Sequence, residues 1–236
     1  MRKRISLKTR RRGLSPEDFR DHYEHRHVPL GLAFIDRFQW RRYVRNYVLE
    51  VIGAPVAFDG YTEFWVDDDA DDEVLARFVA SPEFETLKED DRRFLDVEAR
   101  FSCEVVELPF ARNRRDPGPD AQTLKLALLW TSGAAPPSEV AALAERVTAP
   151  VIDRIAEVSL EKVVDPAPTA PFDTLLTLRL AGARAADLVV DAMPATSWSL
   201  LTLDPVETPA DRLFGGSRMA STEPKPSATP AERTPR

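Results

Sequence analysis

Residues 4–19 read RISLKTRRRGLSPEDF and contain the two local signals from which the rest of the chain can be interpreted. Ile5 and Leu7 alternate with polar or charged residues, which is the pattern of a strand with one buried face. Ser15 then has the side chain of a helix N-cap, and Pro16 suits the first helical position. The sequence therefore predicts a strand that leads through a short turn into a helix.

The pattern continues as the element order βαββαβ, which is that of a ferredoxin-like unit. The first helix is predicted to run to about residue 34, and Pro29 inside it predicts a kink or a division into two helices. An acidic segment and a Ser-Pro pair predict further helices after the third strand. The three later strands are predicted at 41–49, 61–66 and 101–108.

The second half of the chain shows the same order of elements at an offset of about 114–121 residues, which indicates an internal repeat. A polar segment with two prolines and a glycine precedes it and is typical of a linker. The last segment is rich in Pro, Ser and Thr, which predicts disorder. The predicted boundaries are a first domain at 1–112, a linker at 113–121, a second, degenerate domain at 122–206 and a disordered tail at 207–236.

Composition and charge limit the classes of partner. The 236 residues are 43% apolar and 30% charged, with a net charge of −7, which fits a folded chain. The single cysteine, Cys103, excludes a disulfide within the chain and favours a reducing compartment. We see no secretion signal and no apolar run of membrane-spanning length, so we expect a cytoplasmic protein without a membrane partner. Residues 47–110 carry a net charge of −13 that would repel phosphate, so no nucleic-acid partner is expected.

Motifs of the first half, taken in order, resemble the EthD domain, a branch of the dimeric α+β barrel superfamily. They span about residues 4–108 and comprise RGLSPEDF (12–19), HVPL (27–30), YVRN (43–46), FDG (58–60), EFW (63–65), SP (81–82) and DDRRF (90–94). The resemblance implies an α+β fold in which two ferredoxin-like units form a barrel, normally across a homodimer. It also implies activities similar to those of polyketide dehydratases and cyclases, lactone isomerases and cofactor-free oxygenases.

The second half departs from this pattern. It has TAP at 148–150 where HVP would stand, and it has no counterpart of Asp90 and Asp91. A fused repeat could supply the barrel partner within one chain, so we expect either a monomeric pseudo-dimer or a homodimer. The second unit is expected to supply fold rather than chemistry.

His27 is the strongest candidate for chemistry. It lies late on the predicted helix, on the stripe that also carries apolar residues, and a histidine can take and return a proton near neutral pH. The alternative is a helix-terminal histidine bonded to backbone carbonyls. Asp90 or Asp91 could orient His27 or hold a substrate hydroxyl, and the alternative for both is a solvated charge run.

Six residues on or near the second and third strands are candidates for substrate binding. Alternation along a strand predicts that Tyr61, Glu63 and Trp65 share one face. Asp59 is also explained as a turn former before Gly60, and plain core packing is the alternative for the others. The full set is Tyr43, Asn46, Asp59, Tyr61, Glu63 and Trp65.

Neither a metal nor a cofactor is predicted. On an ideal helix His27 turns away from His22 by about 140°, and no residue at ligand spacing completes a site with His25. His22 and His25 are therefore interpreted as solvent-facing partners of Asp21 and Glu24. The chain has no glycine-rich phosphate loop, and a haem site is a distant third reading because only His27 could be an axial ligand.

The sequence thus predicts a cofactor-independent, EthD-like enzyme of the dehydratase, isomerase or oxygenase type. Its substrate would be a small apolar oxygenated compound, aromatic or polyketide-like, with His27 as general acid/base. The alternative is a non-catalytic ligand-binding or accessory protein of the same barrel fold.

Overall fold

The computed structural model describes residues 1–110, 123–131, 133, 135–167, 169–181, 185–193 and 198–214. The first half contains β1 (Arg2–Lys8), α1 (Pro16–His22), the π-helical turn η1 (Tyr23–His27), α2 (Val28–Leu32), α3 (Ile35–Phe38), β2 (Trp40–Gly53), β3 (Gly60–Val66), α4 (Asp72–Val79), α5 (Pro82–Phe94) and β4 (Phe101–Glu107). The second half contains β5 (Thr123–Trp130), α6 (Pro137–Thr148), η2 (Ala149–Arg154), β6 (Ile155–Val163), β7 (Thr174–Ala181), α7 (Ala185–Asp191), β8 (Trp198–Glu207) and α8 (Ala210–Phe214). None of the described helices is both long and apolar enough to span a membrane.

The eight strands form one closed barrel in the order β1-β3-β2-β8-β5-β7-β6-β4, with antiparallel pairing throughout. Pairing of β2 with β8 and of β4 with β6 joins the two halves, so the barrel closes within a single chain. This long β2–β8 ladder explains why β2 extends beyond the predicted strand at 41–49. The predicted α+β fold with two ferredoxin-like units in a barrel is confirmed.

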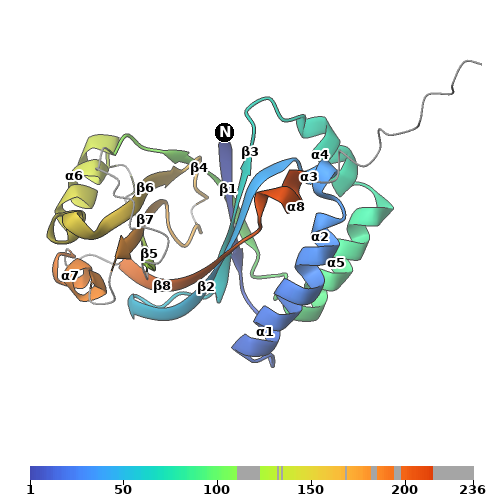
Figure 1. Cartoon of the computed structure of the whole chain (residues 1–236), viewed down its shortest axis with the longest axis horizontal. Helices are drawn as coiled ribbons and strands as arrows, with labels where there is room; N and C mark the ends of the chain where they lie inside the picture. Colours follow the sequence, from blue (N-terminus) through green and yellow to red (C-terminus); the bar gives the residue numbers. More distant parts are fainter. Residues whose placement is uncertain are drawn as a thin grey trace, which may run out of the picture.

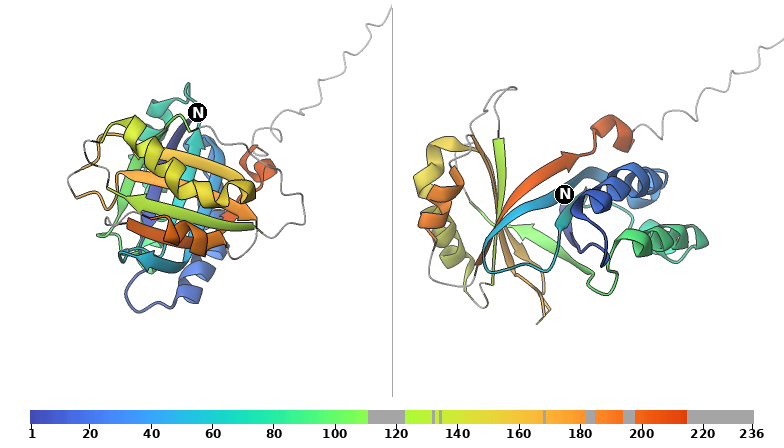
Figure 2. Two further views of the ribbon diagram at one scale, coloured as in Figure 1. Left: turned by 90° about the vertical axis from the view of Figure 1, so that its left-hand side faces the viewer. Right: turned by 90° about the horizontal axis from the view of Figure 1, so that it is seen from below.

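Two helical layers cover opposite sides of the barrel (Figures 1 and 2). The helices α1, α2 and α5 lie on one side, and α6 and α7 lie on the other. Because side chains alternate across each strand, the molecule has three apolar cores, one inside the barrel and one under each helical layer. Each strand of the first half therefore presents one set of side chains to the barrel interior and another to the first helical layer.

The predicted first helix starts as expected but is divided by a π-helical turn. Ser15 caps α1 by accepting a hydrogen bond from the Asp18 amide at 3.0 Å. At the end of η1 the Val28 amide donates to the Tyr23 carbonyl, five residues back. Pro29 follows immediately, and it has no amide hydrogen for a regular helical bond, so the wider turn falls where the regular ladder is interrupted.

The chain is folded beyond the predicted end of the second domain. The Thr208 amide donates to the Tyr43 carbonyl at 3.0 Å, and α8 places Leu213 in the core under the first helical layer. The Arg45 guanidinium also donates to Thr208 Oγ1 at 2.7 Å, so the prediction of a disordered tail from residue 207 is wrong for 207–214. Residues 215–236 and the predicted linker at 113–121 lie outside the described residues.

Gly53 ends β2 opposite Ser199 of β8, and its substitution tests the pairing of the two halves. Its φ is +92°, and a Cβ atom there would lie 2.6 Å from the Trp198 carbonyl oxygen. We expect Gly53→Ala to lower the free energy of unfolding by about 1–3 kcal/mol in denaturant titrations, because the backbone would be strained and the ladder displaced.

Gly31→Ala in α2 is the matched control. A Cβ atom at Gly31 would meet nothing within 4 Å, so alanine should leave stability unchanged or raise it by up to about 1 kcal/mol. Equal stability losses in the two variants would contradict the described geometry at Gly53.

Candidate functional site

The sheet of the first half separates the predicted site residues. Tyr43 packs in the core under the first helical layer, and the side chains of His27, Asp90 and Asp91 meet within that layer. Asn46, Tyr61, Glu63 and Trp65 face the barrel interior. Asp59 lies in the loop before β3 and accepts a hydrogen bond from the Arg10 amide at 2.8 Å. The structure therefore does not bring the nine residues into one site.

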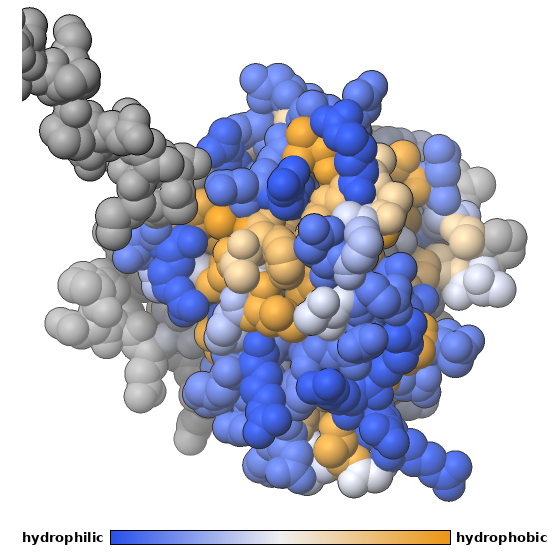
Figure 3. All heavy atoms as spheres, turned by 90° about the vertical axis from the view of Figure 1, so that its right-hand side faces the viewer, coloured by the Kyte–Doolittle hydropathy of each residue, from blue (hydrophilic) through white to orange (hydrophobic). Residues whose placement is uncertain are grey.

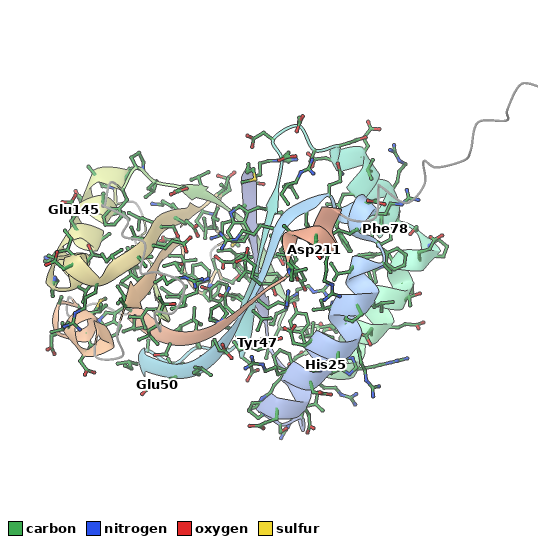
Figure 4. The ribbon with its side chains drawn as sticks, viewed as in Figure 1. His25, Tyr47, Glu50, Phe78, Glu145 and Asp211 are labelled. Carbon is green, nitrogen blue, oxygen red and sulfur yellow. The ribbon has the colours of Figure 1, made fainter. Side chains whose placement is uncertain are left out.

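On the helical side, two histidines converge on one carboxylate. His22 Nε2 lies 3.0 Å from Asp90 Oδ1, and His27 Nδ1 lies 3.0 Å from Asp90 Oδ2. The expectation that His22 faces solvent and that His27 turns away from it is wrong, because it assumed an ideal α-helix. The π-helical turn η1 lies between them and brings residues five apart to the same side. His25 does face solvent, beside Asp21 (Figure 4).

The second carboxylate extends this group to the start of β4. Asp91 Oδ1 lies 3.6 Å from His27 Nε2, and Asp91 Oδ2 accepts a hydrogen bond from Arg100. The His22 ring stacks on Phe94, with the two ring centroids 4.7 Å apart. We refer to His22, His27, Asp90, Asp91 and Arg100 as the histidine–aspartate cluster.

The charge state of Asp90 determines which ring nitrogen of each histidine carries a proton. Burial alone would raise the pKa of Asp90, but the hydrogen bonds from His27 and His22 outweigh burial and hold it below its ordinary value. Ionised Asp90 can only accept hydrogen bonds, so His27 Nδ1 and His22 Nε2 must both carry protons. In a neutral His27 the lone pair is then on Nε2, the atom that faces Asp91. Nε2 is thus the nitrogen of His27 that Asp90 leaves unbonded.

A cavity of about 290 Å³ lies between the first helical layer and the sheet. Its wall is largely aromatic and aliphatic, with Phe38, Trp40, Phe64 and Phe84 among the lining residues, and Arg100 is one of its cations. Figure 3 shows an apolar area in the middle of this helical face, surrounded by hydrophilic residues. His27 does not line the cavity, but Arg100 does. Both residues contact the Asp91 carboxylate.

Tyr43 supports this cavity from behind. Its ring stacks on Phe64 with centroids 5.2 Å apart and lies 4.7 Å from the Trp40 ring, and both neighbours line the cavity. Burial raises the pKa of Tyr43 well above its ordinary value, so the phenol is neutral. Tyr43 is thus placed for packing rather than for direct contact with a ligand.

Inside the barrel, five side chains form a buried network of charges and hydrogen bonds. Glu63 accepts from Lys3 at 2.6 Å, from Lys125 at 2.8 Å and from Asn46 at 2.9 Å. Lys125 also donates to Asn46 Oδ1 at 2.8 Å, and Lys3 donates to Glu161 at 2.6 Å. A cavity of about 200 Å³ lies beside this network, and we call it the interior polar chamber. It is lined by Lys3, Arg42, Glu63, Trp65, Glu107, Lys125, Glu157, Val158, Ser159, Glu161, Thr177 and Arg179.

The two glutamates of this network differ in their preferred protonation state. Burial favours a neutral Glu63, but Lys3 and Lys125 outweigh burial and hold its pKa well below the ordinary value. Burial raises the pKa of Glu161, and the single cation Lys3 does not compensate beside the like charge of Glu63. Glu63 is therefore the fixed anion of the chamber, and Glu161 is the carboxyl more easily protonated.

Sequence reasoning missed the contribution of the second half. Lys125, Glu161, Thr177 and Arg179 all come from β5, β6 and β7 and line the chamber. The second unit, expected to supply mostly fold, also supplies charged and polar side chains to the chamber walls. The signal was present, because Lys125 is a single charge within the otherwise apolar Leu124–Trp130 segment, at an inward-facing position.

Two other features of the barrel carry less chemistry. A cavity of about 570 Å³ lies at the end of the barrel away from the interior polar chamber, and among the described residues Glu98 and Arg100 are the charged ones that line it. Burial raises the pKa of the Cys103 thiol to about 11, so it is protonated at neutral pH. Within the described ranges, no group of three or more His, Cys, Asp or Glu residues is arranged to hold a metal ion.

The comparison with protein families gives a match in the first half of the chain. Residues 11–98 match the family model of the EthD domain, which confirms the resemblance seen in the sequence. None of the curated proteins compared with the chain matched it.

Several solved structures are similar to this chain. The match to a proposed monooxygenase from Lactobacillus acidophilus covers 88% of this chain and 95% of the monooxygenase chain, at 8% identity and a TM-score of 0.49. The match to an anthrone oxidase-like protein covers 87% of this chain and 92% of that protein's chain, at 11% identity and a TM-score of 0.45. The match to a mutant chlorite dismutase from Candidatus Nitrospira defluvii covers 90% of this chain and 93% of the dismutase chain, at 10% identity and a TM-score of 0.46.

Asp90→Asn tests the histidine–aspartate cluster through stability. Because the folded-state pKa of Asp90 is depressed, its contribution is present above the unfolded pKa of about 3.9 and is lost as the pH falls through the folded value. We expect the variant to be about 1–3 kcal/mol less stable at pH 7 in denaturant titrations, with the difference shrinking below about pH 4. Asp21→Asn, in the exposed pair with His25, should change nothing measurable. A pH-independent difference for Asp90→Asn would contradict the ionised, hydrogen-bonded carboxylate.

Lys125→Met tests the buried network. It leaves Glu63 with one cation instead of two inside the barrel, and we expect a loss of about 3–5 kcal/mol in the free energy of unfolding. Lys88→Met removes an exposed pair with Glu85 and should stay within about 0.5 kcal/mol of the wild type. If Lys125→Met were as stable as Lys88→Met, the charges would not be buried as described.

Proposed function

The first half of the chain carries an EthD domain, and we propose that the protein is a cofactor-independent enzyme whose acid/base residue is His27. The observation that carries this proposal is the orientation of His27, whose Nδ1 is held by Asp90 while Nε2 faces Asp91. An oriented imidazole with one committed nitrogen is suited to proton transfer at the other.

The neighbouring cavity supports a substrate that is apolar, oxygenated and aromatic or polyketide-like. Aromatic rings form much of its wall, and a planar substrate can stack on such rings. Arg100 lines the same cavity and is bonded to the Asp91 oxygen opposite the one that faces His27. Asp91 therefore connects the cavity-lining Arg100 with His27 Nε2.

The chemistry then follows from these two groups. Nε2 of His27 takes a proton from a carbon acid or a hydroxyl, and the negative charge that develops on the substrate oxygen is stabilised by the Arg100 guanidinium. Asp90 keeps the imidazole oriented and stabilises it when it becomes charged. Dehydration, isomerisation and cofactor-free oxygenation all include a proton removal of this kind, so the proposal covers these three reaction types.

A non-catalytic ligand-binding protein is the second candidate. It is favoured by one observation, namely that His27 does not itself line the cavity. In this role the aromatic wall would hold the ligand, and the histidine–aspartate cluster would only stabilise the packing of η1 against α5.

Turnover assays with His27→Gln separate the two candidates. The panel would contain hydroxylated naphthalenes and anthraquinones, aromatic polyketides and lactones. We expect His27→Gln to lower kcat by about 10²–10⁴-fold with little change in KM, because only the proton transfer is lost. Arg100→Leu should raise KM as well, because the oxygen of the substrate loses its cation.

His25→Gln is the matched control, since His25 belongs to the same π-helical turn and its side chain is 75% exposed. It should leave both constants unchanged. Unchanged turnover in His27→Gln would overturn the acid/base role, and binding of the panel without turnover by the wild type would favour the second candidate.

A further inference from the structure

The interior polar chamber lies on the other side of the sheet from the proposed active site. Its walls come from both halves of the chain, with Lys3 and Glu63 from the first and Lys125 and Glu161 from the second. Burying charged groups is costly unless they are paired. The barrel interior nevertheless holds two lysines and two glutamates beside a cavity of about 200 Å³.

The network leaves hydrogen-bonding capacity unused around this cavity. Glu161 is only 3% exposed, and its Oε2 atom is buried without a hydrogen-bond partner. The Thr177 hydroxyl, which lines the cavity, is likewise buried without a hydrogen bond of good geometry. Buried polar groups in native structures are nearly always satisfied, so unpartnered atoms at the edge of a polar cavity indicate a missing polar molecule.

Besides the unpartnered acceptor Glu161 Oε2, the chamber has unused donors. An ammonium group has three N–H donors, and Lys3 and Lys125 each use two of them on the network described above. Arg179 is the least committed guanidinium of the chamber, because its ion pair with Glu157 is 3.5 Å long and its Nε makes no hydrogen bond. These spare donors favour an oxygen-rich ligand, and the weakly paired Arg179 guanidinium favours one that carries a carboxylate.

The mouth of the chamber allows such a ligand to enter. Arg42 pairs with Glu207 at 2.8 Å, Arg179 pairs with Glu157, and all four side chains are about one-third to one-half exposed. Such partly solvated pairs can rearrange at little cost. Trp65 forms an apolar part of the wall, with Lys3 and Arg42 both within 5 Å of its ring centroid.

We propose that the interior polar chamber binds a small hydroxycarboxylate. Its carboxylate would bind Arg179 near the mouth, and its hydroxyl would accept from the spare N–H groups of Lys3 and Lys125. The cavity is smaller than those that hold drug-sized ligands, which limits the ligand to a few carbon atoms. This site is independent of the proposed catalytic role of His27, because the sheet lies between them.

Isothermal titration calorimetry of the full chain tests this proposal with lactate, malate and tartrate as probes. Glycerol and putrescine are the neutral and cationic comparisons. We expect binding of at least one hydroxycarboxylate and no binding of glycerol or putrescine. Preference for glycerol or putrescine, or no heat with any hydroxycarboxylate at millimolar concentration, would overturn the proposal.

Two substitutions place the binding in the chamber. Arg179→Gln should weaken binding at least tenfold, because it removes the cation near the mouth. Glu161→Gln should tighten binding, because it removes a negative charge while keeping a polar side chain next to Lys3. Arg92→Gln, in an exposed pair with Glu85 on α5, is the matched control and should not change the affinity.

Thermal unfolding of each variant shows whether it is folded at the temperature of the titration. If binding survived Arg179→Gln, or if Glu161→Gln weakened it in a folded protein, the ligand would not be held by these groups and the proposal would be wrong.

Discussion

The pairing of β2 with β8, and of β4 with β6, closes eight strands of one chain into a barrel. Closure gives each strand an inner face cut off from bulk water and an outer face under a helical layer. Alternation of side chains then decides which chemistry each face holds. On β2, Asn46 joins the buried network of the barrel, whereas its neighbour Tyr47 packs outside and donates to Glu24. The two candidate sites are separated for this reason.

Much of the architecture is readable from local sequence, because strand alternation and helix capping are short-range effects. The alternation around Ile5 and Leu7, and the cap formed by Ser15, both appear in the structure as the sequence indicates. The geometry of the histidine pair was not readable in this way. It depends on a π-helical turn before Pro29, and a projection on an ideal helix places His22 and His27 on different faces. Similarly, strand periodicity places Tyr61, Glu63 and Trp65 on one face, but the partners Lys125 and Glu161 depend on barrel closure.

The two sites also differ in how they use charge. In the histidine–aspartate cluster, one carboxylate holds two imidazoles in a fixed orientation. In the interior polar chamber, Glu63 is fixed as an anion by two lysines, and the spare donors around it suit binding rather than proton transfer. A barrel formed within one chain permits this difference, because its two halves need not carry the same residues.

We propose that the two faces of one sheet bind different molecules. An NMR titration that follows the His27 imidazole and the Trp65 indole in the same sample tests it most directly. A hydroxylated naphthalene should shift the His27 signals and leave Trp65 unchanged, and a hydroxycarboxylate should shift Trp65 and leave His27 unchanged. If both probes moved the same side chain, or if neither side chain responded to its own probe, the account of two separate sites would be contradicted.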